Sequence, residues 1–164
     1  MKRNGPVARK AEVPPQMLKF RPYALGNFEA CLAIFDSNTP PYFAPHERAQ
    51  FDQFLRAPNA DYWVAEDDTG AIVACGGYYV KRETGEAGLA WGMVARAHHG
   101  GGIGRALLDF RLALLRGDPD ARTVMLQTSQ YTAGFFAKAG FITDRVIRDG
   151  FAPGLHRVDM HLAL

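Results

Sequence analysis

The chain has 164 residues, of which 48% are apolar, including 11 Phe. This composition supplies one compact core, and we expect a single domain over residues 17–164. No apolar run approaches the roughly 20 residues that a membrane span needs, and residues 1–16 lack the apolar stretch of a signal peptide, so we expect a cytoplasmic protein with no membrane partner.

The formal net charge of +2 is unevenly distributed along the chain. Residues 1–16 hold four of the 19 Lys and Arg residues but only one of the 17 Asp and Glu residues, which leaves the remainder near −1. We therefore expect a flexible basic N-terminal tail and no nucleic-acid partner. Cys31 and Cys75 lack metal-binding or redox spacing, which predicts reduced thiols.

Hydrophobic periodicity predicts the order strand, two helices, three strands, helix, strand, helix and two strands. In the longest helix, Ile103, Leu107, Phe110 and Leu114 are expected to form the apolar stripe that faces the core. The strands are predicted over residues 17–23, 61–66, 71–80, 86–94, 122–128, 141–148 and 155–164, and the helices over residues 25–35, 46–55, 102–116 and 131–138.

The most distinctive stretch is the glycine turn before the longest helix, where residues 94–108 read VARAHHGGGIGRALL. Glycine lets the backbone turn sharply and lets a ligand approach closely, because it has no Cβ. Ser, Thr, Asp and Asn, the usual capping residues, are all missing at the start of this helix. Its free N–H groups, at the positive end of the helix dipole, predict an anion site whose usual ligand is phosphate.

Two common phosphate fingerprints do not fit the turn. A Walker loop needs Lys followed by Ser or Thr after its last glycine, whereas Arg105 follows Gly104. The third position of a dinucleotide fingerprint holds Arg105 or Leu107 instead of glycine. The pattern Q/R-x-x-G-x-G/A does fit, with His99 in first place, followed by Gly102 and Gly104. This is the acyl-CoA pyrophosphate signature of the GNAT N-acetyltransferase superfamily, which the chain resembles.

The resemblance implies an α/β fold whose central mixed, mostly antiparallel sheet has about seven strands with four helices. It also implies acetyl-CoA as co-substrate, no metal, a small-molecule primary amine as acceptor, and a backbone N–H near Met93 or Val94 as oxyanion donor. A homodimer is left open. The residues expected to bind acetyl-CoA are Gly92, Met93, Val94, His99, Gly100, Gly101, Gly102, Ile103, Gly104, Arg105, Ser129 and Phe136.

A second motif lies downstream, where residues 129–141 read SQYTAGFFAKAGF, similar to the family pattern N-x-x-A-x-x-F-Y-x-K-x-G-F. Ser129 stands where the family often has an Asn that contacts the pantetheine arm. Phe136 stands where many members have Tyr, the proposed acid for the departing thiolate. A thiol of pKa about 8.5 is a tolerable leaving group, so we expect water, Ser129 or Tyr131 to protonate it, and Tyr131 is our predicted catalytic acid.

The strand before the glycine turn contains an unusual run of small residues. Period-two alternation puts Glu86, Gly88, Ala90 and Gly92 on one face if no bulge intervenes. That face would leave room for a thioester arm or a substrate across the strand. Glu86, at its far end, is the predicted general base, relaying a proton through water.

Three functions remain open on these grounds. The first is an N-acetyltransferase acting on a small amine, the second a protein acetyltransferase acting on Lys or an N-terminus, and the third a catalytically silent CoA-binding module. The Phe at position 136 keeps the third open. The acceptor pocket is expected around residues 37–45, with Tyr42 and Phe43. His98 and His99 are not a metal pair, because neighbouring side chains diverge.

Overall fold

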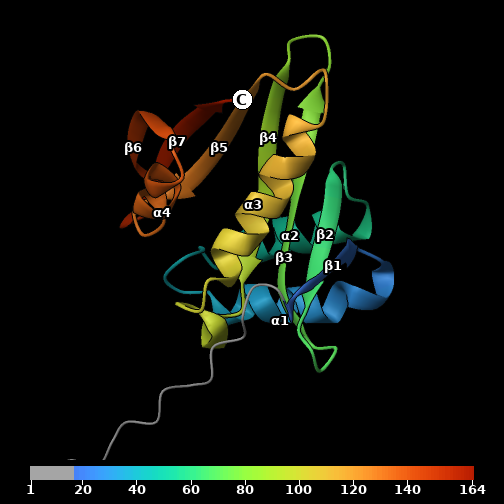
Figure 1. Ribbon diagram of the computed structural model, residues 1–164. Coiled ribbons are helices and arrows are strands. Elements are labelled where there is room, and N and C mark those ends of the chain that lie inside the picture. The colour runs from blue at the N-terminus through green and yellow to red at the C-terminus, as the bar shows by residue number, and fades with distance from the viewer. Residues whose placement is uncertain (1–16) are drawn as a thin grey trace, which may run out of the picture.

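The computed structural model describes residues 17–164, which form one seven-stranded sheet with helices on both of its faces (Figure 1). The predicted flexible tail at residues 1–16 lies outside the described residues. The strand order is β1-β2-β3-β4-β5-β7-β6, and every neighbouring pair is antiparallel except β4 and β5. The predicted fold class, a mixed and mostly antiparallel sheet with four helices, is confirmed.

The order of elements follows the predicted one, with short 3₁₀ turns added at Leu25–Asn27 and Arg96–His98. The largest shift is in the sixth strand, which continues past the predicted end at residue 148. The strands are β1 (Lys19–Pro22), β2 (Asp61–Glu66), β3 (Ile72–Lys81), β4 (Glu86–Val94), β5 (Thr123–Ser129), β6 (Ile142–Ala152) and β7 (Leu155–Ala163), and the helices are α1 (Phe28–Ser37), α2 (Glu47–Arg56), α3 (Ile103–Arg116) and α4 (Ala133–Lys138).

The core is divided by the sheet. On one face, α1 and α2 pack against β2–β4 through an aromatic cluster in which Phe35 and Phe51 are fully buried and Trp91 is partly buried. On the other face, α3 covers β3 and β4 (Figure 1). Burial of such aromatic side chains contributes most of the driving force for this half of the fold.

The apolar stripe of α3 differs in part from the predicted one. Ile103 and Leu107 are buried as expected, but Phe110 and Leu114 are only half-buried. Phe110 instead stacks on Phe20 of β1, with ring centroids 4.3 Å apart. The helix crosses both halves of the sheet, so its buried face is wider and turned away from the predicted stripe. The buried residues of α3 are Ile103, Leu107, Leu108, Arg111, Leu112 and Leu115.

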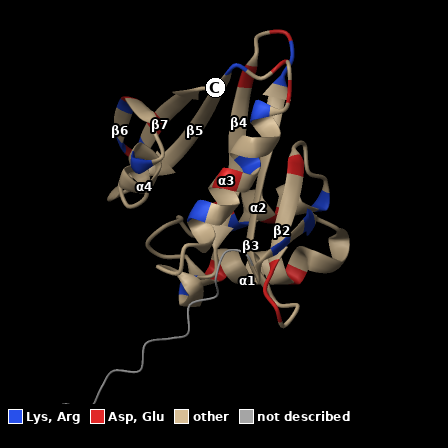
Figure 2. Cartoon of the chain, viewed as in Figure 1, with Lys and Arg blue, Asp and Glu red and all other residues tan. Residues whose placement is uncertain are grey.

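Strands β4 and β5 pair only over their first residues and then diverge. Their parallel pairing covers only Glu86–Gly88 against Thr123–Met125. Beyond these residues the ribbons of β5, β7, β6 and α4 diverge from β4 (Figure 1), while buried side chains such as Val124 and Met160 pack with Leu108 and Leu112 of α3. Charged residues of both signs are interspersed over both parts (Figure 2). Within residues 17–164, no helix is long and apolar enough to cross a membrane.

Candidate active site

A cavity of about 1070 Å³ lies between the diverging strands β4 and β5. The loop between α1 and α2, the N-terminus of α3 and helix α4 complete its walls. Of the predicted site residues, Gly101 and Ile103 do not line it, and Ile103, the first residue of α3, is instead buried in the core between α3 and the sheet. The predicted residues that do line it are Glu86, Gly92, Met93, Val94, His99, Gly100, Gly102, Gly104, Arg105, Ser129, Tyr131 and Phe136.

The N-terminus of α3 opens into this cavity. Gly100 and Gly102 have φ values of +82° and +84°, in the left-handed region that favours glycine. Gly102 is the N-cap, no side chain caps the helix, and its first turn contains no acidic residue. A Cβ added to Gly104 would lie 3.7 Å from Val94 and from Phe135, so the turn leaves space for a ligand. This arrangement has the properties of an anion site.

His99, which takes the first place of the pyrophosphate signature, has a partner within the protein. Its Nε2 lies 2.9 Å from the carbonyl oxygen of Val94. A carbonyl only accepts, so Nε2 carries the hydrogen, and Nδ1 donates only when the ring is protonated. Arg105, also at this turn, pairs with Asp109 at 2.9 Å. The backbone N–H groups at the start of α3, which no side chain caps, are therefore the donors at this turn without a side-chain partner.

The end of β4 is held in place by Asn38, which the sequence analysis missed. This residue is 2% exposed, and its Nδ2 donates to the carbonyl oxygens of Val94 and Ile34, each at 2.9 Å. The N–H of Ala95 donates to the carbonyl of Val73 on β3 at 2.8 Å. Because ladder hydrogen bonds alternate between the two edges of a strand, the N–H of Val94 points away from β3, toward the open edge.

A bulge in β4 overturns the predicted small-residue face. Cys75 pairs with Met93 but Gly77 pairs with Ala90, so β4 has one residue more than β3 in this interval. The bulge is at Trp91, whose φ of +46° is unusual for a residue other than glycine. A bulge exchanges the faces of a strand beyond it.

Gly92 consequently lies on the α3 side, opposite Gly88 and Ala90. A Cβ on Gly92 would come within 2.7 Å of the guanidinium of Arg111, whereas a Cβ on Gly88 would meet the ring of Tyr79 at 2.2 Å. The space expected beside Gly92 is therefore filled by Arg111 of α3, and the space expected beside Gly88 is filled by Tyr79 of β3. Replacing Gly92 with Leu would disturb core packing rather than block an open cleft.

Three carboxylates line the cavity, those of Glu47, Glu86 and Asp159, and the first two lie in different environments. Glu86 forms an ion pair with Lys81 at 2.7 Å and is half-exposed. Glu47, at the start of α2, is 8% exposed and accepts the N–H of Ala44 at 2.7 Å. Burial raises the pKa of Glu47 above its ordinary value. An acidic residue in the first turn of a helix is ordinary in sequence, so no pattern marked Glu47 as a site residue.

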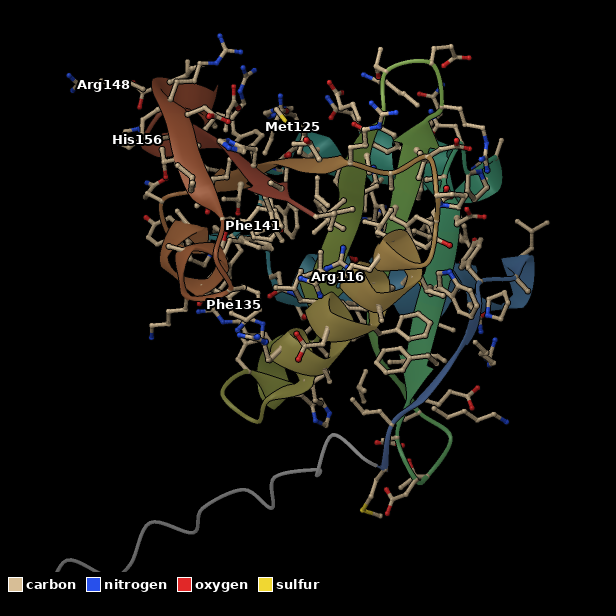
Figure 3. All side chains as sticks on the ribbon, turned by 45° about the horizontal axis from the view of Figure 1, so that its top comes forward. Arg116, Met125, Phe135, Phe141, Arg148 and His156 are labelled. Atoms are coloured by element: carbon tan, nitrogen blue, oxygen red, sulfur yellow. The ribbon has the colours of Figure 1, made fainter. Side chains whose placement is uncertain are left out.

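The α4 side of the cavity is mostly aromatic. Phe136 packs edge-on against Phe141, with ring centroids 5.6 Å apart. Figure 3 shows Phe135 at the side of α4 that faces α3, in agreement with its closeness to Gly104. Tyr131 is 54% exposed at the rim.

The hydroxyl of Ser129 is engaged locally, because it accepts the N–H of Tyr131 at 3.3 Å. It remains part of the cavity wall. Among residues 17–164, His, Cys, Asp and Glu side chains form no group of three that could hold a metal ion.

Comparison with solved structures identifies the same fold in other proteins. A GNAT-family protein from Desulfovibrio desulfuricans has a TM-score of 0.73 at 22% identity, covering 89% of this chain and 98% of its own. A GCN5-related N-acetyltransferase from Kribbella flavida has a TM-score of 0.73 at 20% identity, covering 92% and 99%. The spermidine N-acetyltransferase of Vibrio cholerae, in complex with CoA and spermine, has a TM-score of 0.69 at 15% identity, covering 90% and 96%.

No curated protein matches the chain significantly. The model of the acetyltransferase (GNAT) family matches residues 29–141, which is more than two thirds of the chain and includes the glycine turn, the bulged strand and α4. With the fold and this match together, the chain belongs to the acetyltransferase (GNAT) family.

Proposed function

We propose that this protein is an N-acetyltransferase that moves the acetyl group of acetyl-CoA to a primary amine of a small molecule. The observation that carries the proposal is the uncapped N-terminus of α3, which opens into a cavity of about 1070 Å³ between β4 and β5. This volume is at the upper end of the range for small-molecule and cofactor sites. It suits a ligand as long as acetyl-CoA together with an acceptor.

Acetyl-CoA fits this cavity from the glycine turn inward. The N–H groups at the start of α3 would bind the pyrophosphate, and the pantetheine arm would run along the unpaired edge of β4. The N–H of Val94 at that edge is our proposed oxyanion donor. A preorganised donor of this kind contributes about 2.7–4 kcal/mol to transition-state stabilisation in comparable sites.

The acceptor would enter on the side of the α1–α2 loop, where aromatic and acidic side chains line the cavity. Tyr42, Phe43 and Trp91 supply aromatic rings, whose negative faces favour an ammonium group. Glu86 was the sequence-based candidate for the base, but Glu47 is the more buried of the two carboxylates. A carboxylate with a raised pKa is the better base near neutral pH, so we propose Glu47 as the base with Glu86 as the alternative.

Glu47→Gln tests this assignment with little risk to the fold, because the amide oxygen of Gln still accepts the N–H of Ala44. We expect kcat to fall at least about tenfold, and the low-pH limb of the rate profile to be lost. Glu86→Gln, which only breaks the exposed pair with Lys81, is the matched control. If only the Glu86 variant loses the low-pH limb of the rate profile, then Glu86 is the general base.

A CoA-binding module without transferase activity is the second candidate, favoured by Phe136, which cannot donate a proton. A screen of small amines, Lys peptides and N-terminal peptides for CoA release from acetyl-CoA separates these functions. We expect release with small amines. Release only with peptides would support a protein acetyltransferase. Tight acetyl-CoA binding with no release would support the silent module.

A further inference from the structure

Arg111 is a buried arginine in the middle of α3, 3% exposed, and within residues 17–164 it makes no ion pair. Its Nε donates to the carbonyl of Leu107 at 3.3 Å and its Nη1 to the carbonyl of Gly77 at 3.4 Å, both long contacts. Burial lowers the pKa of Arg111 to about 10, so the group is still charged at neutral pH. A buried charge without a partner is costly, and an anion beside it would be stabilised.

The guanidinium lies at the bulge of β4. Ideal Cβ atoms built on Gly76 and Gly92 would lie 3.2 Å and 2.7 Å from its Nη1, so two glycines make the room it occupies. Arg111 also lines the cavity between β4 and β5 together with Gly92. A positive charge therefore borders the cavity at the point where the strands diverge.

The depth of this charge matches the length of a pantetheine arm. Arg111 follows Ile103 by eight residues, which is about 12 Å along the helix axis. The arm is about as long as the backbone of four residues and spans about 14 Å when extended. With the pyrophosphate at the N-terminus of α3, as the proposed function requires, the arm is long enough to bring the sulfur of CoA to the guanidinium beside Gly92, two residues before the proposed oxyanion donor Val94 on β4.

We propose that Arg111 supplies the positive charge that stabilises the CoA thiolate as it leaves. In the transfer step the amine nitrogen bonds to the thioester carbon, the carbon–sulfur bond breaks, and its electron pair departs with sulfur. The ammonium proton passes to the base on the acceptor side. Phe136 gives sulfur no proton, and a fixed cation nearby lets the thiolate leave unprotonated.

The thiol of bound CoA reports this charge directly, without turnover. The pH titration of CoA bound to the wild-type protein is followed by ultraviolet absorbance of the thiolate, with the complex of desulfo-CoA subtracted. This subtraction removes the titration of Tyr62 on β2 and Cys75 on β3, the titratable groups that interact with Arg111. The other charged or titratable side chains around the cavity also act on the thiol, but they are the same in the wild type and the variants, so the comparison between these proteins isolates Arg111. They are His98, His99, Glu47, Lys81, Glu86, Arg105, Arg145 and Asp159.

We expect the bound thiol to titrate at least one pH unit below free CoA, which is a tenfold change in the equilibrium. In Arg111→Met the thiol pKa should rise by at least one unit, while Arg111→Lys should keep most of the depression. Arg116→Met, which removes an exposed charge from the same helix, should leave the thiol pKa unchanged. The kcat of Arg111→Met should fall at least tenfold with little change in KM.

Thermal unfolding separates this role from a structural one. Removing a buried charge with no partner should leave the Tm of Arg111→Met unchanged or higher. Equal thiol pKa values in the wild type and Arg111→Met overturn the inference but leave the proposed function intact. If Arg111→Met does not fold, a thiol pKa of CoA bound to the wild type that equals the pKa of free CoA overturns the inference. Failure of CoA to bind the wild type by calorimetry overturns the proposed function and the inference together.

Discussion

The two walls of the cavity are built differently. The β4 wall is covered on both faces, by α1 and α2 on one side and α3 on the other, and its fully buried side chains include Phe35, Phe51 and Leu55. The β5 wall consists of β5, β7 and β6 with the short helix α4. Its strand β6 is exposed along most of its length, and Ile142 and Val146 are 61% and 60% exposed.

This difference assigns different tasks to the two walls. Groups that need fixed geometry, such as the uncapped start of α3, the N–H of Val94 and the guanidinium of Arg111, all belong to the β4 wall. The β5 wall has a buried cluster against α3 that includes Val124, Val158 and Met160, and it adds ladder hydrogen bonds and the ion pairs of Asp159 with Arg145 and Arg157. We therefore expect substitutions in the two walls to differ in size and in pH dependence.

The largest expected effect is in the core of the β4 wall. Phe51→Ala should lower the free energy of unfolding by about 3–5 kcal/mol, because it removes a fully buried aromatic ring. Val146→Thr, which keeps the β-branched shape on the exposed face of β6, should change it by less than about 0.5 kcal/mol. Urea unfolding measures both, and a cost above about 1 kcal/mol for Val146→Thr would show that this face is covered in solution.

A smaller, pH-dependent effect is expected in the β5 wall. Burial raises the pKa of Asp159, but hydrogen bonds from Arg157 and Arg145 outweigh it and hold the pKa below its ordinary value. A lowered folded-state pKa contributes stability above the unfolded pKa of about 3.9, and this stability is lost as the pH falls through the folded value.

Asp159→Asn should therefore cost about 1 kcal/mol at pH 7, since both arginines keep some access to water. Thermal unfolding at pH 7 and at pH 3 should show the wild type and the variant converging at the lower pH. A difference in Tm that stays the same at both pH values would remove the ion pairs as its cause.

The smallest expected effect concerns the ring on α4. Phe136→Tyr should change kcat by less than about tenfold, or about 1.4 kcal/mol, because thiolate departure does not depend on an acid at this position. Steady-state kinetics with the best amine from the screen provides the measurement. A much larger gain would mean that the native protein is impaired at this step and would favour the CoA-binding module.

The order of elements and the glycine turn could be predicted from sequence because both depend on local signals. Strand β4 begins and ends where alternation predicted, at Glu86 and Val94. The start of α3 follows from the conformational freedom of Gly100 and Gly102. Local backbone preferences and hydrophobic periodicity determine these features.

The features that required the structure depend on contacts between distant residues. The bulge at Trp91 is stabilised by Tyr62 on β2, whose hydroxyl donates a hydrogen bond to the Trp91 carbonyl at 2.9 Å. No sequence pattern marked Arg111, because a charged side chain is rarely buried without a partner, whereas Gly76 and Gly92 make room for it in the core. The hydrogen bond of His99 to Val94 likewise depends on how the turn folds back on the strand.

Calorimetry on a glycine variant tests whether acetyl-CoA binds at the N-terminus of α3. Gly102 is a poor choice, because its φ of +84° would strain any β-branched replacement. Gly104 is already helical, and a Cβ there has no neighbour closer than 3.7 Å. Gly104→Val should therefore fill the ligand space without breaking the turn, and Gly26→Ala, at an open position far along the chain, is the matched control.

We predict low-micromolar acetyl-CoA binding for the wild type and for Gly26→Ala. Binding by Gly104→Val should be weaker by more than about tenfold, at least about 1.4 kcal/mol, with the Tm retained. Unchanged acetyl-CoA affinity in a folded Gly104→Val protein would show that the ligand does not occupy the start of α3.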